Sequence, residues 1–83
     1  DTRECKEVLR RAGLRTTAPR MATLAALALP GGHHDAERIA HAVRTQLVTV
    51  STQAVYNNLA ALVAIGLVRR IELPGQPARY ELR

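Results

Sequence analysis

Apolar residues recur at helical spacing in four segments of this 83-residue chain. The predicted helices cover residues 5–12, 17–28, 35–47 and 51–65. Thr17, Asp35 and Ser51 are placed to cap the last three, because their side-chain oxygens can accept hydrogen bonds from free N–H groups of the first turn. Gly13 and Gly66 follow the first and fourth segments, where glycine favours a helix end.

The pattern changes to strict alternation after residue 66. Apolar and charged residues alternate over 70–73 and again over 78–83, and Pro-Gly-Gln-Pro at 74–77 supplies a turn. The alternation predicts a two-stranded hairpin with one apolar side, made of Ile71, Leu73, Ala78, Tyr80 and Leu82. Such a hairpin is marginally stable alone and must pack on the helices. About four helices followed by a hairpin predict a mostly helical α+β fold, the winged helix-turn-helix.

Composition agrees with a single helical domain over residues 1–83. The chain has 14 Ala and 11 Leu but no Phe and no Trp, which suits close-packed helices better than aromatic-rich strands. No apolar run approaches the length that crosses a bilayer, and one Cys forms no internal disulfide, so a cytoplasmic protein is expected. Because the chain begins at Asp1 rather than Met, we expect it to be a piece of a longer protein.

The charge balance makes nucleic acid the first partner to consider. Lys and Arg number 12 against 7 Asp and Glu, which gives a net charge of +5, and 11 of the 12 cations are Arg. The planar guanidinium can donate two parallel hydrogen bonds to a phosphate. Many small basic domains bind no nucleic acid, so charge alone decides nothing.

The fourth predicted helix carries the strongest functional signal. One face is apolar, and the other presents polar side chains near the helix start followed by the small residues Ala60 and Ala64, as a helix entering the major groove requires. The candidate DNA contacts on this helix are Ser51, Thr52, Gln53, Tyr56 and Asn57. The alternative is an ordinary solvated face, but such a face normally carries Lys and Glu, and this one has neither.

Three further candidate DNA contacts, Arg15, Thr17 and Arg20, flank the start of the second helix, where free N–H groups attract phosphate. The two arginines fit phosphate or minor-groove contacts, although solvated surface cations would look the same in sequence. Arg69, Arg70 and Arg79 on the hairpin fit either backbone contacts of a wing or a solvated strand face.

Four motifs together resemble the ferric uptake regulator (Fur) family over nearly the whole chain. They are AGLRTTAPR at 12–20, HHDAE at 33–37, VSTQAVYN at 50–57, and GLVRR at 66–70 with ARYE at 78–81. The third motif is most similar to the actinobacterial FurA/CatR branch, which represses catalase genes.

This resemblance implies a metal- or peroxide-responsive repressor that binds AT-rich inverted repeats of double-stranded DNA as a homodimer. On matching positions, Tyr56 would contact a thymine and Arg15 would enter the minor groove. Two positions depart from the family pattern: Asn57 stands where Arg is usual, and Ala54 where Thr is usual. Both departures bear on which operator is read more than on DNA binding itself.

The resemblance also implies metal ligands at His33 and Glu81. Two donors hold a metal weakly, so the remaining ligands are expected in a C-terminal dimerisation domain beyond Arg83. The full-length protein would then carry zinc and a regulatory iron or manganese, with no cofactor within this stretch. Without the resemblance, His33 would be a loop residue with no ligand role, and His34 and His41 are expected at the surface.

Two other function classes compete with DNA binding. Winged helices also serve as protein–protein adaptors, in which the apolar hairpin or a helix face docks on a partner. An enzyme is not indicated, because the spacing shows no nucleophile–base pair, no Gly-rich phosphate loop and no paired carboxylates. Cys5 lies at a core-facing position, where a small apolar role is expected rather than redox chemistry.

Overall fold

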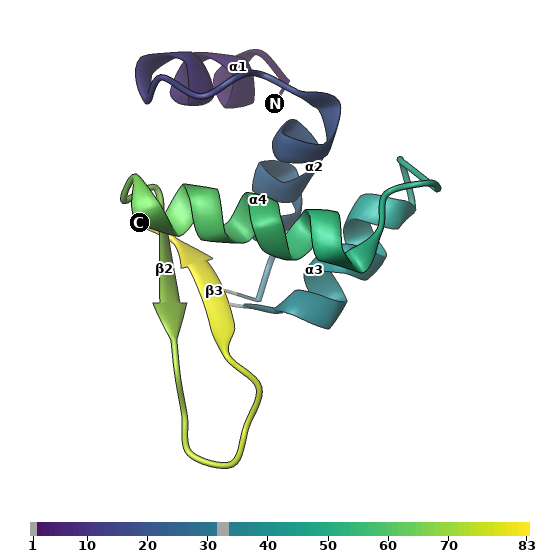
Figure 1. The fold of residues 1–83 in the computed structure, drawn as a ribbon, viewed down its shortest axis with the longest axis vertical. Coiled ribbons are helices and arrows are strands. Elements are labelled where there is room, and N and C mark those ends of the chain that lie inside the picture. The colour runs from purple at the N-terminus through teal and green to yellow at the C-terminus, as the bar shows by residue number, and fades with distance from the viewer. Residues whose placement is uncertain (1, 32–33) are drawn as a thin grey trace.

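The computed structural model describes residues 2–31 and 34–83. In chain order the elements are α1 (Thr2–Arg11), α2 (Ala18–Leu27), β1 (His34–Asp35), α3 (Ala36–Arg44), α4 (Thr52–Ala64), β2 (Val68–Ile71) and β3 (Arg79–Leu82). Figure 1 shows α4 lying across α2 and α3, with α1 at one end of the molecule and the β2–β3 hairpin extending from the other. The mostly helical α+β winged-helix fold is confirmed.

All three predicted N-caps form. Each side-chain oxygen accepts a hydrogen bond from the backbone N–H three residues later, at 2.9 to 3.3 Å. The caps are Thr17, Asp35 and Ser51. Gly13 and Gly66 follow α1 and α4 with φ of 80° and 81°, a left-handed conformation that only glycine adopts without strain. The third helix ends at Arg44 rather than at residue 47, although Leu47 still packs against the core.

The core sits where α4 crosses α2 and α3. Val55, Leu59 and Leu62 point inward from α4 and are fully buried. They meet buried side chains of the three other helices and of the sheet, among them Leu9, Leu24, Leu27, Ile39, Val43 and Val68. The helices therefore hold together through one shared cluster, as the spacing of apolar residues predicts.

The sheet differs from the expected hairpin in two ways. A third short strand, β1, pairs with β3, so the antiparallel order is β1-β3-β2. The expected apolar side is also wrong in part, because Ile71 lies opposite Arg79 whereas Arg70 lies opposite Tyr80. Directly paired residues share a face, so Ile71 and Tyr80 face opposite ways. Val68 and Tyr80 carry the packing instead, and both are buried.

Two leucines expected on that apolar side, Leu73 and Leu82, are each 40% exposed. Leu73 lies beyond the end of β2, in the connection to β3. Among the described residues, no helix is long and apolar enough to cross a membrane.

We predict that Leu59→Ala lowers the free energy of unfolding by about 2–5 kcal/mol, because it leaves a cavity at the centre of the shared core. Leu73→Ala makes the same chemical change at an exposed hairpin position and should shift stability by only about 0.5 kcal/mol. Urea denaturation followed by circular dichroism measures both. Equal losses in the two variants would contradict the position of the core.

Candidate nucleic-acid interface

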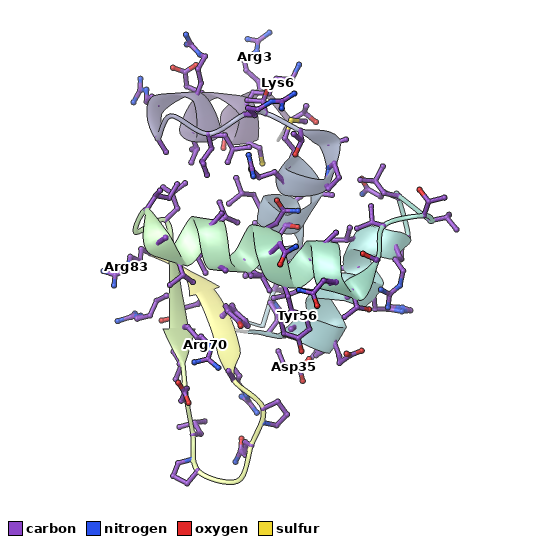
Figure 2. All side chains as sticks on the ribbon, viewed as in Figure 1. Arg3, Lys6, Asp35, Tyr56, Arg70 and Arg83 are labelled. Atoms are coloured by element: carbon purple, nitrogen blue, oxygen red, sulfur yellow. The ribbon has the colours of Figure 1, made fainter. Side chains whose placement is uncertain are left out.

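The outer face of α4 is polar but uncharged. Gln53, Tyr56 and Asn57 lie exposed on it, followed by the exposed small residues Ala60 and Ala64. Tyr56 keeps 42% of its surface accessible, although burial of an aromatic ring is ordinarily favourable. Figure 2 shows Tyr56 on the side of α4 that faces the hairpin, while Arg3 and Lys6 lie at the far end of the molecule on α1.

A groove separates this face from the wing. It has a volume of about 470 Å³ and is lined by Tyr56, Asn57, Ala60, Val63, Ala64, Arg70 and Tyr80. Arg70 reaches it from β2 and is ion-paired with Glu72. Contact with the Tyr80 hydroxyl, and then the Glu72 carboxylate, raises the pKa of Arg70. The Glu72 carboxylate offsets part of the guanidinium charge at the edge of the groove.

The start of α4 is fastened to α3. Arg44, in the last turn of α3, donates from Nη1 to the Thr52 hydroxyl at 3.0 Å. The Ser51 hydroxyl caps the same turn by accepting from the Ala54 N–H. Each hydroxyl can still donate its own proton, so both candidate contacts stay usable. Arg44 was not predicted from the sequence. It could have been found as a basic residue in the last turn of the helix that precedes Ser51.

Arg20 connects three separate parts of the chain. Its Nε donates to Asn58 Oδ1 on α4 at 3.2 Å, and its Nη1 donates to the Arg15 carbonyl at 3.1 Å. Thr17, between the two arginines, caps α2. Arg20 therefore holds the loop that carries the exposed Arg15 against α4. These two hydrogen bonds use part of the donor capacity of its own guanidinium.

Two adjacent side chains on α4 bind each other. Gln53 Nε2 donates to Asn57 Oδ1 at 3.0 Å, one helical turn along the exposed face. Both residues were predicted as separate contacts, and the structure brings them together as a pair.

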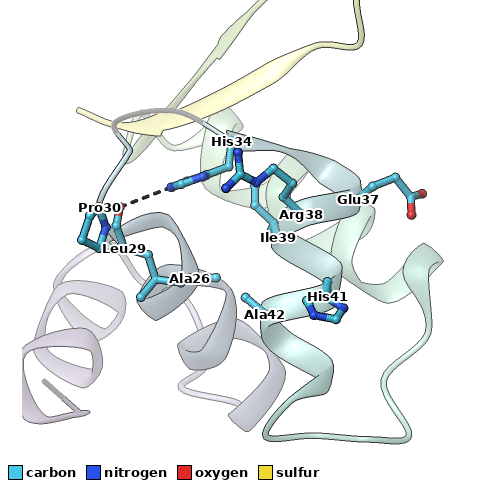
Figure 3. Close-up of a pocket in the computed structure, with 9 residues that line it drawn as sticks. All are labelled: Ala26, Leu29, Pro30, His34, Glu37, Arg38, Ile39, His41 and Ala42. Atoms are coloured by element: carbon cyan, nitrogen blue, oxygen red, sulfur yellow. Dashed lines mark hydrogen bonds between the residues drawn. The ribbon is translucent and has the colours of Figure 1, made fainter.

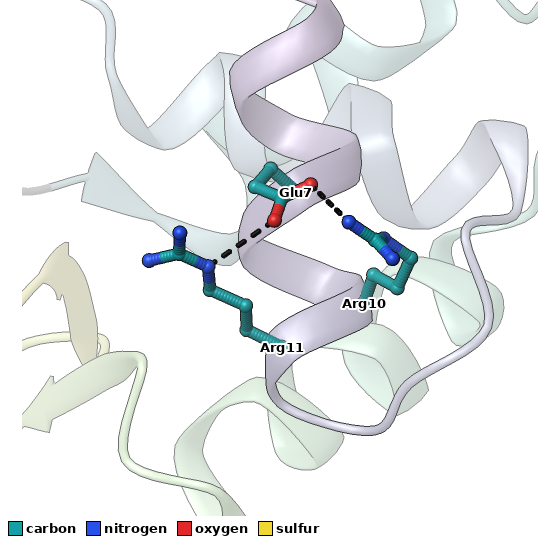
Figure 4. Close-up of polar contacts among 3 residues, drawn as sticks. All are labelled: Glu7, Arg10 and Arg11. Carbon is teal, nitrogen blue, oxygen red and sulfur yellow. Dashed lines mark hydrogen bonds and ion pairs between the residues drawn. The ribbon is translucent and has the colours of Figure 1, made fainter.

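Several arginines outside this face are paired with carboxylates. Arg10 and Arg11 on α1 donate to Glu7 at 2.7 and 3.2 Å (Figure 4). The hydrogen bond from Arg10 is the main reason that the pKa of Glu7 is lowered. These pairs are exposed, so they reduce the local charge of α1 more than they stabilise the fold.

One of the two predicted metal ligands lies in the described part of the chain. His33 lies outside the described residues, and the Glu81 carboxylate accepts hydrogen bonds from Arg69 Nε at 2.9 Å and Nη2 at 2.5 Å. Within residues 2–31 and 34–83 no three His, Cys, Asp or Glu side chains cluster in a way that could hold a metal ion. The metal assignment therefore stays a prediction.

The expectation that His34 is a surface residue is wrong. Its side chain is 6% exposed, and its Nε2 lies 3.3 Å from the Leu29 carbonyl oxygen, to which it can donate (Figure 3). Pairing of β1 with β3 sets His34 opposite Tyr80 and turns the imidazole ring inward. The ring packs against Gly31, where an added Cβ would lie 3.1 Å from His34 Cε1. His41 is exposed, as predicted, and Cys5 is half-buried against the core.

Comparison with known proteins shows the family of the chain. The Ferric uptake regulator family matches residues 11–83. The chain is 55% identical over 78 residues to the transcriptional regulator FurA of Mycobacterium tuberculosis, covering 93% of this chain and 52% of that protein. It is 51% identical over 76 residues to Ferric uptake regulation protein 1 of Mycolicibacterium fortuitum, covering 92% and 47%. The chain thus spans about half the length of these relatives.

A solved structure agrees with the fold. The ferric uptake regulator from Pseudomonas aeruginosa with manganese superposes with a TM-score of 0.83 at 35% identity, covering 93% of this chain and 58% of that one. The mycobacterial matches agree with the predicted actinobacterial FurA branch. The chain belongs to the ferric uptake regulator family.

Proposed function

We propose that this chain is the DNA-binding domain of a metal- or peroxide-responsive transcriptional repressor, which places α4 in the major groove of AT-rich inverted repeats. The observation that carries the proposal is the outer face of α4, which is exposed, rich in hydrogen-bonding groups and free of charged residues from Thr52 to Ala64. Such a face discriminates between base edges, which carry donors, acceptors and methyl groups rather than charges.

Affinity in this proposal comes from residues around α4. Arg15 enters the minor groove from the loop that Arg20 fastens to Asn58. The first turn of α4, held by Arg44, directs its free N–H groups and the Ser51 and Thr52 hydroxyls toward the phosphates. Arg70 stands at the edge of the groove on the wing side. Phosphate contacts of this kind position the domain, and base contacts specify the site.

A homodimer is proposed for the longer protein, because an inverted repeat presents two half-sites that a two-fold dimer matches. One domain alone loses the gain from tethering two half-sites and should bind weakly. Zinc and a regulatory iron or manganese are proposed only for that longer protein. Of the two proposed ligands, Glu81 is ion-paired with Arg69. We propose no catalytic activity.

We predict that Tyr56→Ala weakens binding to an AT-rich inverted-repeat duplex by about 1–3 kcal/mol and leaves binding to a scrambled duplex unchanged. The substitution removes the contact between the aromatic ring and a thymine methyl group. Titration of isotope-labelled protein followed by NMR measures both affinities, even where they are weak. Val8→Ala on α1, at similar exposure to Tyr56, is the matched control and should change neither. Unaltered preference for the repeat in Tyr56→Ala would rule out the major-groove role.

A second prediction distinguishes the role of Arg15 from that of Arg20. Arg15→Gln should reduce the slope of log K against log salt by about 0.9, because the variant loses one positive charge that displaces counterions from the DNA. Arg20→Lys keeps the charge but cannot make both hydrogen bonds, so it should leave the slope unchanged and weaken binding by about 0.5–1.5 kcal/mol.

Fluorescence anisotropy at several salt concentrations tests both variants. Full affinity in Arg20→Lys would show that its contacts with Asn58 and Arg15 do not support binding. A wild-type chain whose binding shows no salt dependence and no preference between duplexes would favour the protein–protein adaptor instead.

A further inference from the structure

The hydrogen bond between Gln53 and Asn57 joins two exposed amides within the outer face of α4. Gln53 Nε2 donates to Asn57 Oδ1 at 3.0 Å, and both residues remain exposed. A donor so placed restricts rotation of the Asn57 amide, because turning it over would direct an N–H group toward the N–H of Gln53. The orientation of the Asn57 amide is therefore coupled to that of the Gln53 amide.

The pairing leaves Asn57 with a defined set of free groups. Its Oδ1 keeps one of two lone pairs, and its Nδ2 keeps both N–H groups. In the major groove, adenine offers an N6 donor beside an N7 acceptor, so an amide binds it with one bond each way. Guanine offers two acceptors, N7 and O6, so an oriented Oδ1 would face another acceptor.

The surroundings of Asn57 suit close approach to a base. The asparagine side chain is short, so it reads a base only if the helix lies deep in the groove. Ala60 and Ala64 continue the same exposed face, and with Asn57 they line the groove beside the wing. No charged side chain of α4 lies on this face.

We propose that Gln53 and Asn57 act as one adenine-reading unit, in which Asn57 contacts adenine N6 and N7 and Gln53 is the positioning residue that orients it. The inference rests on the proposed function, because it assumes that α4 enters the major groove. It goes further by naming the base and the two residues that select it.

The test is a selection at low salt from duplexes with randomised half-sites, followed by binding measurements on the selected duplex. We expect the wild-type chain to enrich adenine strongly at one position. Replacing that adenine by 7-deaza-adenine, which lacks the N7 acceptor, should weaken wild-type binding by about 5- to 100-fold. In Asn57→Ala the same replacement should have no effect, and adenine enrichment at that position should disappear.

The variants of Gln53 test the positioning role. Gln53→Ala should reduce the preference for adenine over guanine at that position while Asn57 remains present, and Gln53→Glu should reduce it too, since a carboxylate has no proton to donate. Gln46→Ala is the matched control, because this exposed glutamine lies outside α4 and should leave the preference intact. The side chains of Gln46, Gln53 and Asn57 are all exposed, so none of these substitutions removes core packing. Amide NMR spectra check that each variant is folded.

The outcomes separate the two proposals. If Tyr56→Ala abolishes preference for the selected duplex but Asn57→Ala keeps adenine enrichment at every position, the adenine-reading unit is overturned and the proposed function stands. Gln53→Ala with an unchanged base preference removes the positioning role of Gln53. If the wild-type chain enriches no sequence at all, both proposals fall.

Discussion

Burial of one side of α4 is the interaction on which the rest of the molecule depends. Val55, Leu59 and Leu62 are fully enclosed by side chains of the other helices and the sheet. Because a helix turns about 100° per residue, fixing these three fixes the direction of every other side chain on α4. Gln53, Tyr56 and Asn57 face outward for this reason. The core thus determines the orientation of the proposed reading face.

Polar contacts at both flanks of α4 then refine its position. Arg44 fastens its first turn from α3, and Arg20 reaches its middle from α2 through Asn58. On the wing side, Val68 and Tyr80 anchor the hairpin to the core, so the groove beside α4 has a fixed wall. Hydrogen bonds of this type contribute modestly to stability, but their geometry aligns elements that apolar packing alone leaves free to slide.

Sequence alone was sufficient for the features that rest on local chemistry. Cap residues act on the next turn, and apolar spacing marks the buried face, so the starts of the three capped helices and the inner side of α4 were predictable. The first helix has no such cap signal, and it begins at Thr2 rather than at residue 5. The register of β2 against β3 was not, because nothing local to Ile71 shows that Arg79 will lie opposite it. The two-residue strand β1 has no periodicity to detect, and it is this strand that buries His34. The link from Arg20 to Asn58 spans 38 residues, beyond any pattern in the chain.

In the proposed complex, affinity and specificity come from different parts of the surface. The positive charges proposed to contact DNA lie on the loop before α2, on the end of α3 and on the wing, whereas α4 carries none from Thr52 to Ala64. Phosphate contacts by arginine depend on salt and not on sequence, and base contacts by amides depend on sequence and little on salt. An exposed residue such as Asn57 supports neither the core nor the caps. Its replacement would therefore alter the sequence that is read while the fold and the phosphate contacts persist.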